Sequence, residues 1–134
     1  MTKRQAIVLI NRSLGEERLN PRNTHWSNVV EYRSEQGWWL NIPFPKFSQD
    51  LNIILNSEQM KVFLHIVVPA NSVIDPKSEF RNKEGAADIF MPNIGTNQLI
   101  DTQSGSGRHN FGIYPSKEYS YATAKLPPNI SHLV

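Results

Sequence analysis

Two acids, a lysine and a histidine occur in an order that could serve phosphodiester hydrolysis. Asp75, Glu79 and Lys83 follow one another at four-residue intervals, and His109 lies further along the chain. A Mg²⁺-dependent nuclease needs carboxylates to hold the metal and a cation to balance charge at the scissile phosphate. Pro76 and its polar neighbours favour a loop here, so a solvated charged turn is the ordinary explanation. A small Mg²⁺-dependent nuclease is therefore an alternative hypothesis, with these four residues as its catalytic candidates.

Other catalytic or cofactor sites find little support in the sequence. The chain contains no cysteine, which excludes disulfides, thiolate metal sites and a cysteine nucleophile. The histidines have no short metal-ligand spacing among them, and the Ser104–Gly107 segment lacks the Gly-Lys-Ser/Thr that completes a phosphate-binding loop. We expect no metal, no cofactor and no catalysis by this chain itself.

Three loops mix cations with amide or hydroxyl groups, as contacts to phosphates and base edges require. They span residues 22–26, 77–83 and 104–110. Their cations are the candidates for phosphate contacts: Arg22, Lys77, Arg81, Lys83 and Arg108. Their amides and one imidazole are the candidates for base edges: Asn23, Asn82, His109 and Asn110. Because loops are ordinarily polar, this pattern alone does not separate a binding face from a solvated surface.

A tryptophan pair, Trp38-Trp39, lies in an apolar run that ends at Pro43 and Pro45. If this run is a strand, the two indoles point to opposite faces, so one joins the core and the other meets a surface or a second layer. An exposed indole could stack on an unpaired base, which typically contributes ~1–3 kcal/mol. Either tryptophan is therefore a candidate for stacking.

The elements that must position these residues indicate an α+β fold. Thr2 and Gln5 form a capping-box pattern before an apolar helical period that ends at Gly15, which predicts a first helix. Residues 16–28 read as a loop, 29–33 and 38–42 as a hairpin with its turn at 34–37, and 62–68, 87–91 and 98–101 as further strands. For residues 47–55 helical and strand periods both occur, and the proline at 45 favours a helix. We expect one or two helices on a small, mainly antiparallel sheet or open barrel.

Length and charge complete the sequence-based picture. The 134 residues suffice for one domain, 1–134, whose tail from about 125 carries little regular structure. Residues 1–33 hold six Lys/Arg against three acids, residues 34–101 five against eight, and residues 102–134 three against one. Basic ends are compatible with a nucleic-acid face. The absence of cysteine and of a long apolar run predicts a cytoplasmic protein without a membrane partner.

The segment Asn41-Ile42-Pro43-Phe44-Pro45, with polar hairpins after it, resembles the B3-like DNA-recognition modules attached to some restriction endonucleases. The resemblance is one of strand pattern, loops and length over residues 26–115. It implies a distorted barrel whose loops enter the major groove of DNA. The leading hypothesis is thus a module that binds duplex DNA, within a restriction-modification setting. A protein-interaction or inhibitory module, with the acidic middle and the tryptophan pair as contact face, is a further alternative. Oligomeric state stays open.

Overall fold

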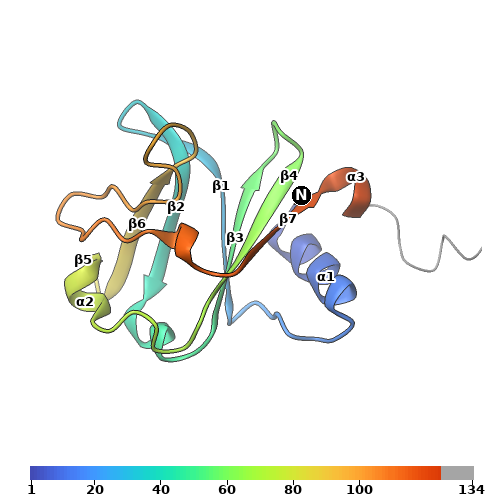
Figure 1. Ribbon diagram of the computed structural model, residues 1–134, viewed down its shortest axis with the longest axis horizontal. Helices are drawn as coiled ribbons and strands as arrows, with labels where there is room; N and C mark the ends of the chain where they lie inside the picture. The colour runs from blue at the N-terminus through green and yellow to red at the C-terminus, as the bar shows by residue number, and fades with distance from the viewer. Residues whose placement is uncertain (125–134) are drawn as a thin grey trace, which may run out of the picture.

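A computed structural model describes residues 1–124 and shows a seven-stranded, mostly antiparallel sheet with helices at its ends and on one face (Figure 1). The expected α+β class, with a sheet that does not close, is confirmed. The elements in chain order are α1 (Lys3–Leu14), β1 (Thr24–Tyr32), β2 (Glu35–Pro43), the 3-10 helix η1 (Phe44–Ser48), β3 (Leu51–Ser57), β4 (Val62–Val68), α2 (Pro76–Glu79), β5 (Arg81–Lys83), β6 (Ala86–Pro92), the 3-10 helix η2 (Phe111–Ile113), β7 (Ser116–Ser120) and α3 (Tyr121–Ala124).

Strand β1 belongs to both halves of the sheet. Its residues 24–28 run parallel to β3, and its residues 29–32 run antiparallel to β2. The strand order is β5-β6-β2-β1-β3-β4-β7. We call β1, β3, β4 and β7 sheet A, and β5, β6, β2 and β1 sheet B. The two sheets diverge from one another on either side of β1, as Figure 1 shows.

The core has two layers because sheet A is covered on both faces. Side chains of both sheets meet between them, among them Leu40, Ile53 and Ile89. On the other face of sheet A, α1 packs Ala6 and Ile10 against Ile54. The helix begins and ends as the sequence predicts, with a Thr2–Gln5 capping box and a left-handed Gly15 at its C-terminus.

The predicted second helix around residues 47–55 is wrong. The chain forms η1 only as far as Ser48 and then enters β3, in which all seven residues are buried. Leu51, Ile53 and Leu55 face sheet B, while Ile54 faces α1. The alternation typical of a strand therefore decides the structure of this segment, although the proline at 45 favours a helix, because β3 is covered on both faces.

Three boundaries also differ from the sequence-based expectation. Strand β1 begins at Thr24, within the segment expected to be a loop, and the β1–β2 turn consists of Arg33 and Ser34, both with positive φ. The strand expected at residues 98–101 is reduced to a single bridge between Ile100 and Asn110. The tail from 125 lies outside the described residues. Strands 38–42, 62–68 and 87–91 are confirmed as parts of β2, β4 and β6.

Within residues 1–124, none of the helices combines the length and the apolar character needed to span a bilayer.

Candidate nucleic-acid interface

The tryptophan pair lies across two faces of β2, as a strand requires. The Trp38 side chain is buried between the sheets, and its indole Nε1 donates to the carbonyl oxygen of Asn56 at 3.0 Å. Trp39 is half-buried on the opposite face of sheet B. One indole therefore serves the core, and the other is available at a surface.

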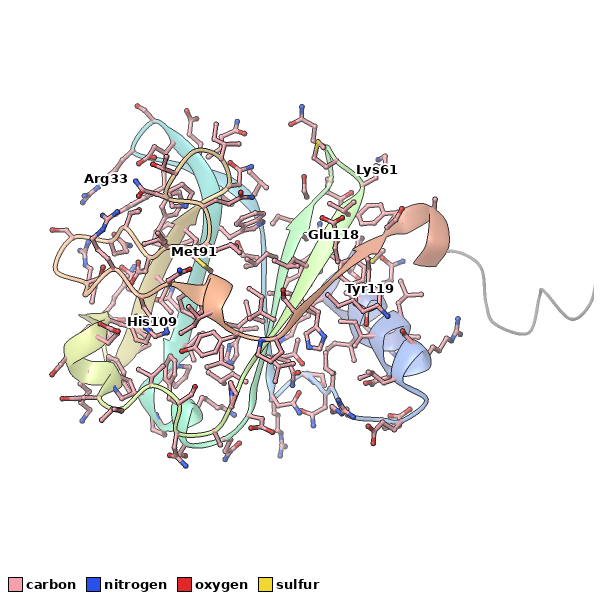
Figure 2. The ribbon with its side chains drawn as sticks, viewed as in Figure 1. Arg33, Lys61, Met91, His109, Glu118 and Tyr119 are labelled. Carbon is pink, nitrogen blue, oxygen red and sulfur yellow. The ribbon has the colours of Figure 1, made fainter. Side chains whose placement is uncertain are left out.

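The outer face of sheet B carries two neighbouring aromatic rings with a cation over each. The guanidinium of Arg33 lies 5.1 Å from the centre of the Tyr32 ring, and Lys83 Nζ lies 5.4 Å from that of Trp39. The centres of the Tyr32 and Trp39 rings are 5.0 Å apart. We call these four residues the aromatic-cation row. Figure 2 shows Arg33 at the far side of the molecule from α1, so this face is not covered by the helix.

Two hairpins bring the row together. The β1–β2 hairpin places Tyr32 and Trp39 on the same face, and the β5–β6 hairpin adds Lys83. Gly37 lies between the rings in β2, and a Cβ there would collide with the Met91 carbonyl oxygen and approach the Phe90 ring. The missing side chain at position 37 thus leaves room for the aromatic rings on this face.

A buried carboxylate fixes the orientation of the row. Asp88 is only 2% exposed and accepts from Trp39 Nε1 and, at 3.0 Å, from Gln103 Nε2. Arg81 Nε lies 3.7 Å from the same carboxylate and supplies a compensating positive charge. The Gln103 amide oxygen accepts from the Tyr32 hydroxyl at 3.2 Å. Because one carboxylate orients several partners, the rings are held in place before any ligand arrives.

A second buried carboxylate lies beneath this arrangement. Asp101 Oδ1 accepts from the backbone N–H groups of Phe90 and Gln103, whereas its Oδ2 is buried without a partner among the described residues. Burial, with a smaller contribution from the Asp88 charge, raises the pKa of Asp101 to about 6. The carboxyl group therefore changes charge near neutral pH, next to residues that support the row.

The second and third predicted loops meet at one end of sheet B. His109 Nδ1 lies 2.8 Å from Glu79 Oε2, and His109 Nε2 lies 2.5 Å from the Tyr114 hydroxyl. The Gly107 N–H also donates to the Glu79 carbonyl oxygen at 2.7 Å. Both nitrogens of the imidazole are thus already engaged, and Figure 2 places His109 beside α2. This cluster ties the glycine-rich loop to α2.

The other predicted contacts are spread more widely. Lys77 and Asn82 are exposed on α2 and β5, Arg108 Nη2 donates to Asn97, and Asn110 caps η2. The segment before β1, which contains Arg22 and Asn23, lies at the bottom of Figure 1, and the Arg22 carbonyl oxygen accepts from Lys46 of η1 at 3.0 Å. The Asn23 amide is held by the turn itself, since it contacts Asn20 and Arg18. The structure therefore joins two of the three predicted loops and leaves the first apart.

The candidates for a nuclease site are brought together only in part. Glu79 and His109 are in contact, whereas Asp75 accepts from the Ser78 hydroxyl and Lys83 lies over Trp39. Among residues 1–124, no group of three or more histidines and acids is arranged to hold a metal ion.

Comparisons of the chain with protein-family models, with characterised proteins and with solved structures return no significant match. The interface therefore has to be interpreted from its own residues. The sequence singled out Trp39, Arg81 and Lys83, but not the residues that join them in the structure: Tyr32, Arg33, Asp88, Asp101 and Gln103. The signal available in the sequence was the strand period, which places Tyr32 and Trp39 on one face once the two-residue turn is known.

Proposed function

We propose that this protein binds nucleic acid through the outer face of sheet B. The observation that carries the proposal is the aromatic-cation row, in which Tyr32 and Trp39 lie side by side between Arg33 and Lys83. Proteins that hold single strands combine aromatic rings for bases with cations for the backbone. The row presents both on one exposed face.

The cations can change partners when a strand binds. Arg33 and Lys83 are exposed, and each lies over an aromatic ring without an ion pair among the described residues. A cation–π contact at an exposed site contributes only ~0.5–1 kcal/mol, whereas stacking of a base contributes ~1–3 kcal/mol. A base can therefore replace the cation on the ring, and the released cation can pair with a phosphate.

This arrangement favours unpaired bases over an intact duplex. A base in a duplex has both of its faces stacked on neighbours, so it must leave the helix to reach Trp39. The sequence-based hypothesis of duplex recognition by three loops, with its resemblance to B3-like modules and its cytoplasmic setting, stays a prediction. Binding of a duplex, measured beside binding of a single strand, tests this hypothesis.

Fluorescence anisotropy with a labelled 12-nucleotide single strand, as DNA and as RNA, and with the matching duplex will test the proposal over a salt series. We expect the single strand to bind more tightly and its affinity to fall as salt rises, because phosphate contacts release counterions. Lys83→Ala and Arg33→Ala should each lower the affinity and reduce the salt slope by about one contact. Trp39→Leu should lower the affinity about 5- to 150-fold, the loss expected from ~1–3 kcal/mol of stacking.

Lys117→Ala is the matched control for the cation variants. Lys117 Nζ lies 5.0 Å from the centre of the Tyr119 ring in sheet A, so it makes the same type of contact on another face. This variant should bind like the unchanged protein. If the duplex binds more tightly than the single strand, and Arg22→Ala and Arg108→Ala lower its affinity, the predicted loops rather than the aromatic-cation row form the binding site. No binding of either form at low salt would overturn the proposal.

A further inference from the structure

An apolar cleft opens between the two sheets where they diverge. Its volume is about 710 Å³, within the usual range for small-molecule sites. Its walls come from both sheets and from the loop after β6, and they include the side chains of Val29, Trp38, Leu55, Val62, Leu64 and Leu99. Trp38 contributes an apolar ring surface, because its Nε1 is already bonded to Asn56.

The apolar walls are not sealed by the fold. Val29, Leu64 and Leu99 are only partly buried, although they pack against the main core, and Val62 is partly buried as well. At the rim, Met60 and Ile94 are 70% and 73% exposed. A ligand with an apolar body would remove this surface from water, and burial contributes about 25 cal/mol per Å².

The charged residues that line the cleft are all acids, and its other polar residues are neutral. Glu118 on β7 lines it, and the lining contains no lysine, arginine or histidine. Glu35 at the start of β2 borders the cleft, but its pairing with Tyr32 places its side chain on the outer face of sheet B. Neither carboxylate makes an ion pair within residues 1–124. Figure 2 shows Glu118 on β7, next to β4. Asn93 lines the same cleft, and its Oδ1 is buried without a donor in the described part of the chain.

We propose that this cleft binds a small organic molecule that combines an apolar body with a protonated amine. The apolar body would lie against Trp38 and Leu64, and the ammonium group would lie at the carboxylate of Glu118, which shares the cleft-facing side of sheet A with its cross-strand partner Leu64. An ammonium group has donors and no acceptors, which matches the acceptor-only carboxylate of Glu118. An anionic ligand would instead meet a like charge.

This inference goes beyond the proposed function and does not depend on it. Trp38 faces the cleft and Trp39 faces the aromatic-cation row, so the two tryptophans serve opposite faces of β2. Failure of nucleic-acid binding would leave the cleft proposal intact, and the reverse also holds.

Three probes of the same size will test the charge preference: 4-phenylbutylamine, 4-phenylbutanol and 4-phenylbutanoate. Titration of the full chain with each, followed by amide and indole N–H chemical shifts at pH 7, gives both the affinity and the location. We expect the amine to bind most tightly and the carboxylate least. The shifts should cluster at Trp38, Leu64 and Leu99.

Variants at the rim separate charge recognition from simple apolar contact. Glu118→Gln should weaken binding of the amine by about 1.4- to 5-fold, as for an exposed ion pair, and leave binding of the alcohol unchanged. Glu35→Gln, on the other face of β2, should have a smaller effect on the amine. Glu118→Lys should reverse the order, so that the carboxylate becomes the preferred probe. Glu17→Gln, an exposed acid after α1, is the control and should change nothing.

Several results would overturn the proposal. These are equal affinity for all three probes, shifts that map away from the cleft, an unchanged order in Glu118→Lys, and no binding of any probe at millimolar concentration. Because Glu118 is exposed on the edge strand β7, its variants keep the buried core unchanged, and a failure to bind would not reflect a failure to fold.

Discussion

At the scale of single residues, two buried carboxylates support the aromatic-cation row from different surroundings. Asp88 has the Arg81 cation and two side-chain donors beside it. Asp101 has backbone donors for one oxygen only, and its pKa is raised to about 6, mainly by burial. A group whose pKa is higher in the folded state keeps its proton there at a pH at which the unfolded chain has lost it. Ionisation of Asp101 therefore destabilises the folded protein.

Asp101→Asn should remove this pH dependence. In the unchanged protein, Asp101 makes its full contribution to the free energy of unfolding below about pH 4. This contribution is lost as the pH rises to about 6, a change of roughly 3 kcal/mol. The free energy of unfolding of Asp101→Asn, relative to that of the unchanged protein, should therefore increase by up to this amount between pH 4 and pH 7. Urea unfolding at four pH values measures it.

The difference between the two proteins is measured because His25 and His65 make the free energy of unfolding depend on pH in the opposite direction. Burial lowers the pKa of each to about 4, so their contribution is lost as the pH falls below about 6.5. Both histidines are present in both proteins and cancel in the difference. Glu17→Gln, which changes an exposed carboxylate, should give a flat difference over the same range. A flat difference for Asp101→Asn would show that its carboxyl group titrates normally.

At the scale of elements, the β1–β2 turn decides the register that aligns Tyr32 with Trp39. The turn has only two residues, Arg33 and Ser34, with φ of 51° and 66°. Such a left-handed pair matches the twist of a hairpin but disfavours residues that have a Cβ. The turn therefore retains the correct register at some cost in stability.

Ser34→Gly should stabilise the protein by ~0.5–1 kcal/mol. Glycine removes the steric cost of the left-handed conformation, which is about 1–2 kcal/mol, and part of this gain is offset by the greater entropy of the unfolded chain. Ser116→Gly in β7, where the backbone is extended, is the control and should destabilise. Chemical denaturation compares the two variants. Destabilisation by Ser34→Gly would mean that the turn adopts another conformation in solution.

The same elements show what the sequence could predict. The β-branched run at Val62–Val68 and the capping box before α1 are local signals, and the structure confirms both. Strand β3 could not be predicted with the same ease, because its burial on both faces depends on sheet B and α1, which come from distant parts of the chain. The site follows the same rule. Trp39 and Lys83 stood out by residue type, whereas Gln103 acquires its place only through the contacts that fold it onto Asp88.

At the scale of the whole molecule, β1 connects the two sheets and so couples the two cores. Its first half pairs with β3 and its second half with β2, which leaves neither sheet complete without it. The sheets also share the core between them. A protein built in this way should unfold as one cooperative unit rather than one sheet at a time.

Truncations in the two cores will test this coupling. Ile42 lies in the core between the sheets and Ile54 in the core beneath α1, and both are fully buried. Ile42→Ala and Ile54→Ala should each cost about 2–5 kcal/mol. In each variant, urea unfolding followed by far-ultraviolet circular dichroism and by tryptophan fluorescence should give one shared midpoint, because loss of either core removes β1 from the other sheet. Separate midpoints for the two signals, with only one of them shifted by Ile54→Ala, would show that sheet B remains folded without the α1 layer. Such a result would also mean that the aromatic-cation row survives when that layer is lost.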